Sequence, residues 1–259
     1  MAFSLPLEQL YALLSHYFFI TVRLAALLTA APVFGENGVP KRVRIGLAVL
    51  AAVLIGGHLP ESGIGVYSWQ GVWVIAKQVI IGASIGLAMQ LLFATVRMAG
   101  EIIGMQMGLS FATFFDPAAG NSPVIARFLN LLVTLLFLVF NGHLWLIAFL
   151  AESFHQLPVN DAPLHAGGFL YLVQQAGIIF RQGLMLGLPI ISVLLCINFT
   201  LGLLNRLTPQ LSIFVVGFPL TLTAGMVALS LIAQTLAPFF ERLMASGFEN
   251  LSTLIMAFS

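Results

Sequence analysis

The chain has 259 residues, of which 60% are hydrophobic and only 7% are charged, with a net charge of +1. Soluble domains carry about 25% charged residues, so this chain has too few polar groups to cover a globular surface in water. A net charge near zero gives no field that attracts nucleic acid. The composition excludes a disordered chain and predicts an integral membrane protein, or a subunit buried among other apolar chains.

Six hydrophobic segments follow one another, at residues 9–31, 43–57, 72–96, 128–151, 169–204 and 211–238. A membrane span needs about 20 mostly apolar residues, so the second segment, with 15 residues, is short for one. We expect one domain over residues 1–259. If all six segments span, basic residues collect on one side, which predicts that both termini face away from the cytoplasm. These residues are Lys41, Arg42, Arg44, Arg97, Arg127 and Arg206.

The stretch from Gly100 to Pro123 reads GEIIGMQMGLSFATFFDPAAGNSP and is apolar, Gly-rich and interrupted. Three glycines recur every four residues at 100, 104 and 108, which on a helix gives a smooth stripe for close packing. The flexible methionine and flat phenylalanine side chains in this stretch can fill a narrow passage without a fixed packing partner. As a hydrophobic segment, residues 98–115 look like a re-entrant or pore-lining element rather than a lipid-facing helix. Composition alone leaves two interpretations open: ordinary helix packing followed by a turn, or a movable element that lines or plugs a pore.

Several ionisable residues lie within or beside apolar segments, where a charge is costly. Arg97 and Glu101 are four residues apart, so we expect them to pair on one helix face. Arg23, Lys77 and Arg181 have no acid nearby in the sequence, and they must snorkel, meet backbone carbonyls or meet another subunit. Two further glycine pairs with a spacing of four predict tight helix packing: Gly82/Gly86 and Gly183/Gly187.

Motifs for enzyme chemistry do not appear in the sequence. The five histidines lack metal-binding spacing, and the chain contains no P-loop, GxSxG or GxGxxG motif. Its one cysteine, Cys196, allows no internal disulfide. We therefore predict no enzyme activity, no cofactor and no metal site.

Three stretches together resemble the flagellar biosynthetic protein FliR family, whose virulence-secretion counterparts are the T-type export-apparatus proteins. They are GMQMGLSFATFFDPAAGNSP at 104–123, FLNLLVTLLFLVFNGHLWLI at 128–147 and LLNRLTPQLSIFVVGFPL at 203–220. The resemblance implies an all-α membrane fold of tilted, broken helical hairpins with a Gly/Met/Phe-rich plug loop. It implies a non-enzymatic core subunit of the flagellar type III protein export gate. That gate forms, with P-type and Q-type subunits, a pore for unfolded flagellar proteins.

The resemblance also implies the roles of particular residues. The pore plug comprises Gly104, Met105, Gln106, Met107, Gly108, Phe111, Phe114, Phe115, Asp116 and Pro117, with Gly104 and Gly108 permitting close packing and Asp116-Pro117 setting the C-terminal turn. A polar turn for subunit contact comprises Asn205, Arg206, Pro209 and Gln210, although a simple hairpin turn that anchors orientation fits the same residues.

The expected location is the bacterial inner membrane within the flagellar basal body. Expected partners are the P-type and Q-type proteins, the other membrane export-apparatus subunits, secreted flagellar proteins in transit and membrane lipid, but no nucleic acid. One alternative is a proton-coupled secondary transporter of a small solute that uses Glu101 or Asp116. Another is a lipid-acting membrane enzyme that uses His143, Glu152 and His155.

Overall fold

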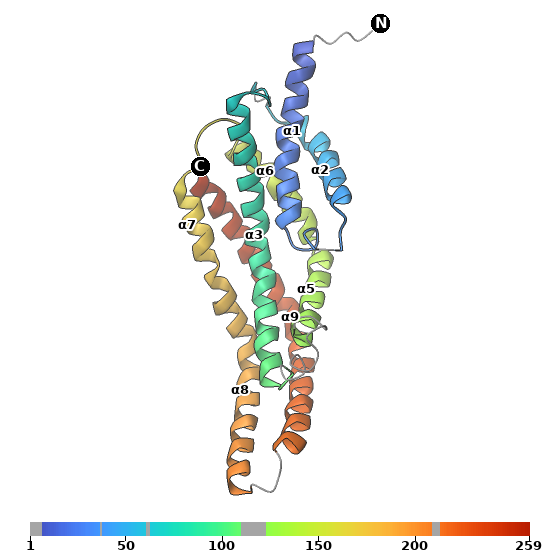
Figure 1. The fold of residues 1–259 in the computed structure, drawn as a ribbon, viewed down its shortest axis with the longest axis vertical. Coiled ribbons are helices and arrows are strands. Elements are labelled where there is room, and N and C mark those ends of the chain that lie inside the picture. The colour runs from blue at the N-terminus through green and yellow to red at the C-terminus, as the bar shows by residue number, and fades with distance from the viewer. Residues whose placement is uncertain (1–6, 37, 61–62, 110–122, 209–212) are drawn as a thin grey trace. The chain divides into compact units, whose positions relative to one another are not determined.

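The computed structural model describes residues 7–36, 38–60, 63–109, 123–208 and 213–259, and the regular elements within these ranges are all α-helices (Figure 1). The predicted all-α fold is therefore confirmed. In chain order the helices are α1 (Leu7–Ala30), α2 (Lys41–Gly56), α3 (Trp69–Gln106), α5 (Val124–Val139), α6 (Gly142–Gln156), α7 (Ala166–Gln175), α8 (Gly177–Leu207) and α9 (Ile213–Phe258).

Four stretches of the described chain are long and apolar enough to cross a membrane: Glu8–Ala30, Trp69–Gln106, Ala166–Leu207 and Val216–Phe258. The consecutive helices α5 and α6, interrupted near Asn141, add a fifth if they count as one broken span. Helix α2 has only 16 residues, or about 24 Å at 1.5 Å per residue, against about 30 Å of hydrocarbon. The six-span arrangement is therefore wrong. The predicted orientation of the termini, which assumed six spans, no longer follows.

The chain forms two compact units from interleaved parts of the sequence. Unit 1 comprises residues 1–90, 141–176 and 246–259, and unit 2 comprises residues 91–140 and 177–245. The long helices α3 and α9 each contribute to both units. The single domain expected over residues 1–259 stays a prediction.

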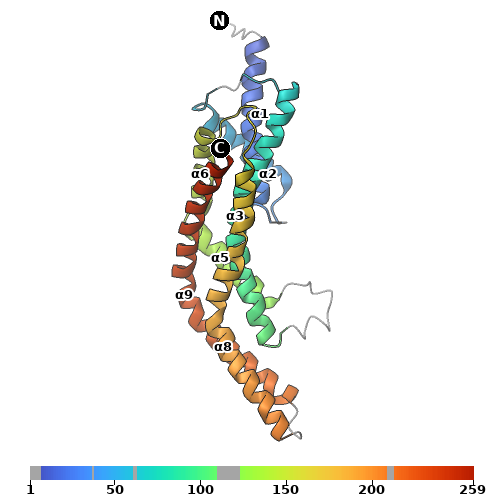
Figure 2. The same cartoon turned by 90° about the vertical axis from the view of Figure 1, so that its left-hand side faces the viewer.

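In unit 1, α1 packs against α2 on one side and closely against the first half of α3 on another (Figures 1 and 2). The approach to α3 is possible because Gly82 and Gly86 have no side chain. A Cβ on Gly82 would overlap the carbonyl oxygen of Arg23, and one on Gly86 would lie 2.8 Å from the Cβ of Ala30. The tight packing predicted from this glycine pair is confirmed.

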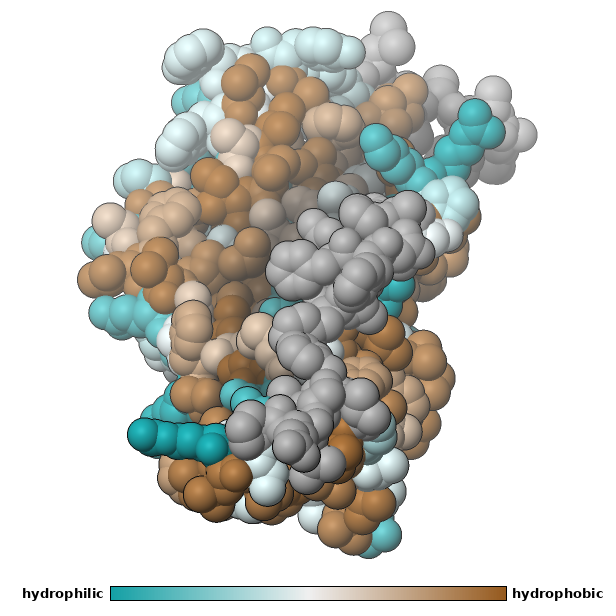
Figure 3. Space-filling model, turned by 60° about the horizontal axis from the view of Figure 1, so that its bottom comes forward, coloured by the Kyte–Doolittle hydropathy of each residue, from teal (hydrophilic) through white to brown (hydrophobic). Residues whose placement is uncertain are grey.

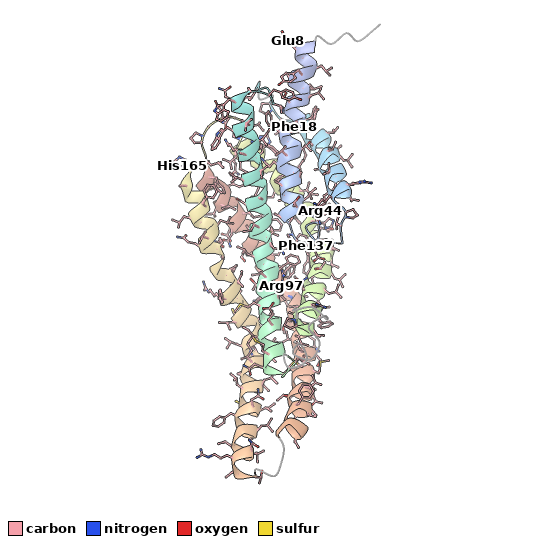
Figure 4. All side chains as sticks on the ribbon, in the orientation of Figure 1. Glu8, Phe18, Arg44, Arg97, Phe137 and His165 are labelled. Carbon is pink, nitrogen blue, oxygen red and sulfur yellow. The ribbon has the colours of Figure 1, made fainter. Side chains whose placement is uncertain are left out.

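In unit 2, the core is built around Phe93 of α3, which meets Phe137 of α5 and Phe240 of α9 edge to face at centroid distances of 5.5 and 5.7 Å. Phe137 is labelled in Figure 4. Helix α8 lies against α3 at Gly183, where an added Cβ would be 2.9 Å from the carbonyl oxygen of Thr95. Gly183 thus permits the tight packing that the sequence predicts.

Helix α3 runs without a break to Gln106, so the predicted end of a span at residue 96 and the start of a separate element at residue 98 are wrong. At 38 residues, α3 is about 57 Å long, nearly twice the hydrocarbon thickness. A helix of this length carries apolar surface well beyond one bilayer core.

Candidate pore segment and buried polar cluster

The predicted plug residues begin at the C-terminal end of α3, which is closed by a defined cap. Gly108 has a φ of +81°, a left-handed conformation that glycine adopts without steric cost. Its N–H donates to Met105 O at 3.1 Å, and the N–H of Leu109 donates to Gly104 O at 3.1 Å. This pair of bonds is a Schellman motif with Gly108 as the residue after the cap.

The cap changes the interpretation of the glycine stripe. Gly108 lies beyond the helix end and serves the turn rather than a packing face. Gly100 does permit a close approach, because an added Cβ would lie 2.6 Å from the Cα of Ala126 on α5. At Gly104 the nearest atom to an added Cβ is the Cβ of Pro123 at 3.5 Å, an ordinary contact. The predicted three-glycine stripe is therefore one tight contact, one ordinary contact and one cap.

Two of the predicted plug residues, next to the cap, are fixed to other helices of unit 2. The fully buried side chain of Met107 occupies the space over Gly225 of α9, where an added Cβ would lie 2.7 Å from the methionine Sδ. Thr221 donates its hydroxyl to the Met107 carbonyl at 3.4 Å. On α8, Asn198 donates its side-chain amide to the carbonyl of Gln106 at 3.2 Å. The last turn of α3 is thus tied to both α8 and α9.

Met105, in contrast, presents 54% of its surface. The other predicted plug residues, Phe111, Phe114, Phe115, Asp116 and Pro117, lie outside the described residues. In the predicted contact turn, Asn205 and Arg206 are exposed at the end of α8, where a cation suits the negative end of the helix dipole. The other two turn residues, Pro209 and Gln210, also lie outside the described part of the chain.

A buried arginine, whose partners the sequence did not reveal, lies at the centre of unit 1. Arg23 is fully buried in α1. Its Nε donates to Gln78 Oε1 at 2.7 Å, Nη1 to Ser153 Oγ at 3.1 Å and Nη2 to Leu157 O at 2.7 Å. The Cζ atom lies 3.9 Å from the ring centroid of Phe154, a cation–π arrangement. Neutral acceptors and an aromatic face therefore hold the guanidinium.

Lys77 has the same kind of surroundings one residue before Gln78. Its Nζ donates to Asn160 Oδ1 at 2.6 Å and to Ala162 O at 3.1 Å. One turn earlier on α3, the indole N–H of Trp73 donates to Asp161 O at 3.2 Å. These donors and Arg23 together hold the connection between α6 and α7, residues 157–165. Of the three environments considered for the two buried cations, backbone carbonyls are observed, at Leu157 and Ala162. Neutral side-chain oxygens, which were not among those environments, supply the other bonds.

Among the described residues, the carboxylates and histidines proposed for the alternative functions do not converge. Arg97 and Glu101 form no ion pair in the described part of the chain, and the buried Nε of Arg97 (labelled in Figure 4) lacks a hydrogen-bond partner there. The predicted local pair is therefore wrong. Asp116 lies outside the described residues. His143 and Glu152 are nine residues apart on α6, about 13.5 Å along the axis. Among the described residues, no group of three His, Cys, Asp or Glu is placed to hold a metal ion.

Comparison with known proteins identifies the family. The model for "Bacterial export proteins, family 1" matches residues 14–247. The chain belongs to this family. Among similar chains, the flagellar biosynthetic protein FliR of Pectobacterium carotovorum subsp. carotovorum is 51% identical over 95% of this chain and 94% of its own length. The FliR protein of Escherichia coli (strain K12) is 49% identical over 96% and 95%, and that of Bacillus subtilis (strain 168) 26% identical over 92% and 94%.

These findings confirm the resemblance on which the sequence prediction relied. The chain is a membrane protein of a flagellar export family, with helices long and apolar enough to span a bilayer. The family match covers α2, α3, α5, α6, α7 and α8 completely, and it therefore includes both the cap at Gly108 and the buried Arg23 cluster.

Proposed function

We propose that this chain is a core subunit of the flagellar type III protein export gate. It acts without enzymatic turnover in the inner membrane, within the flagellar basal body. With P-type and Q-type subunits, and in contact with the other membrane export-apparatus proteins, it forms the pore through which unfolded flagellar proteins pass. Family membership supports the export role.

The observation that carries the pore role is the contrast between two methionines at the end of α3. Met107 is buried over Gly225 and fixed by the bond from Thr221, whereas Met105 on the same turn is largely exposed. The segment that follows Gly108 therefore starts from a rigid base. A plug needs such an anchor, because a segment that moves aside for a substrate must return to the same place.

Methionine suits a passage for unfolded chains because its unbranched, polarisable side chain adapts to partners of different shape. A seal of this kind contacts many different sequences weakly and discriminates little among them. We therefore propose that Met105 lies on the wall of the pore and that Phe111, Phe114 and Phe115, which follow it in the sequence, belong to the plug.

Photo-crosslinking tests this placement. A photoreactive amino acid replaces Met105 in cells that export a flagellar protein carrying a tightly folded C-terminal fusion, which stalls in the gate. The matched control is Met185 of α8, which is also in unit 2 and presents 64% of its surface. We expect the exported protein to crosslink at position 105 at least several times more than at 185. Equal crosslinking at both positions, or none at 105 while the substrate is stalled, contradicts the pore role.

A further inference from the structure

Helix α2 has two chemically different faces. The face toward α1 is made of small residues, Ala48, Ala52 and Gly56, all buried. Gly56 lies directly under the ring of Tyr17, and its carbonyl oxygen is 3.1 Å from Nε2 of His16. This side of α2 is fully used in packing within unit 1.

The opposite face of α2 carries large apolar side chains that nothing in unit 1 covers. Leu50 presents 61% and Leu54 69% of its surface, and the further exposed members are Val43, Ile45, Val49 and Val53. From Ile45 to Gly56 every residue is apolar or glycine. Exposed apolar side chains are also widespread on the face of the molecule shown in Figure 3. What distinguishes α2 is the charge at its N-terminal end.

Three cations, Lys41, Arg42 and Arg44, lie in the first turn of α2, with no acidic residue among them. Cations at a helix N-terminus are unfavourable because the helix dipole is positive there. Glu36, the only acid in residues 32–56, does not neutralise Arg44 directly, since the guanidinium donates to its backbone carbonyl. Lys41 and Arg42 are exposed. Even with Glu36 nearby, this end of the helix therefore carries a net positive charge, and Lys41 and Arg42 expose it.

Exposed aromatic residues lie at the other end of unit 1. Tyr67 and Trp69 present 92% and 89% of their surface, and Tyr67 stacks on Tyr11 of α1 with ring centroids 6.3 Å apart. Tyrosine and tryptophan are enriched at membrane–water interfaces. The 20 residues of α1 from Tyr11 to Ala30 rise about 28 Å along the helix axis, close to the hydrocarbon thickness of about 30 Å.

We propose that α2 is a lipid-facing helix whose outer apolar face lies among acyl chains and whose Lys41 and Arg42 bind the phosphate groups of anionic phospholipids. The charge complementarity of the basic end and the aromatic residues about one bilayer thickness away favour lipid over a protein partner. This contact surface does not depend on the pore role of unit 2.

Spin labelling in membranes that contain the assembled apparatus tests the apolar face. In a Cys196→Ser background, which removes the exposed native thiol, labels are placed at Leu50 and, as an aqueous control, at exposed Gly38. We expect the label at 50 to collide with oxygen and not with a water-soluble nickel chelate, and the label at 38 to collide with the chelate. A label at 50 that meets neither reagent lies under protein, and one that meets the chelate lies in water. Either result overturns the proposal.

Lipid selectivity tests the basic end. The double variant Lys41→Gln/Arg42→Gln and the control Arg181→Gln, an exposed cation of α8, are reconstituted in mixed phosphatidylglycerol and phosphatidylcholine vesicles. Phosphatidylglycerol retained after detergent extraction is then measured by native mass spectrometry. One basic residue near an anionic surface contributes about fivefold in binding, so the double variant should lose about 30-fold in preference. Arg181→Gln should match the wild-type chain. Equal preference in all three proteins overturns the proposal.

Discussion

The close approach of α3 and α5 at Gly100 gives the sharpest stability prediction, because the chain supplies its own control one turn away. In Gly100→Ala the new Cβ meets backbone, with the Cα of Ala126 at 2.6 Å, its N at 3.0 Å and the carbonyl oxygen of Ile125 at 3.2 Å. Backbone atoms cannot rotate away, so the helices must separate. In Gly104→Ala the nearest atom is 3.5 Å away and nothing must move.

The magnitude follows from the difference between the two variants. Both gain about 1 kcal/mol of helix propensity, because alanine replaces glycine inside the same helix. Only Gly100→Ala is also destabilised by overpacking, which typically lowers the free energy of unfolding by about 1–3 kcal/mol. The overpacking cost therefore appears alone when one variant is compared with the other. For a chain of this size, about 2–4 °C per kcal/mol makes Gly100→Ala melt roughly 2–12 °C below Gly104→Ala.

Thermal unfolding of the detergent-solubilised chain, followed by tryptophan fluorescence at one scan rate, measures the difference. Gly104→Ala should melt at or above the wild-type temperature. Equal melting temperatures for the two alanine variants would refute the assigned packing of α3 against α5, since the propensity gain is common to both.

Two further substitutions test the cap and the buried cation. Gly108→Ala forces a Cβ into a left-handed conformation and should lower the free energy of unfolding by about 1–2 kcal/mol. The control Gly202→Ala, with open space around it on α8, should raise the free energy of unfolding by up to about 1 kcal/mol. Equal unfolding temperatures for the two variants would contradict the cap. Gln78→Leu leaves the Nε of Arg23 buried without its acceptor and should lower the free energy of unfolding by at least about 1–3 kcal/mol, while Gln70→Leu, at an exposed site, should change it by less than about 0.5 kcal/mol. Equal losses in a denaturant titration would argue against the buried cluster.

The sequence predicts helix contacts that depend on the absence of a side chain. Gly82 and Gly86 are recognisable because any helix that approaches them meets bare backbone, whichever helix it is. The same pattern misleads at Gly108, because a spacing of four residues does not show where the helix ends. Only the backbone conformation distinguishes a packing glycine from a capping one, and a positive φ is not visible in the spacing.

The partners of the buried cations could not be predicted for a different reason. Arg23 bonds with Gln78, Ser153 and Leu157, at separations of 55 to 134 residues, and no local pattern links such positions. The sequence does identify the cost of these charges in an apolar segment, which is why backbone carbonyls were among the predicted environments. The expected Arg97–Glu101 pair shows the opposite error, because correct helical spacing permits an ion pair without requiring one.

The most direct test of the proposed gate is the composition of the complex that this chain forms. The chain, carrying an affinity tag, is co-expressed with the P-type and Q-type proteins, extracted in mild detergent and measured by native mass spectrometry. We predict one large assembly with a fixed number of each protein and a single defined mass. A monomer or homodimer of this chain, recovered while both partners are present and unbound, would contradict the gate proposal.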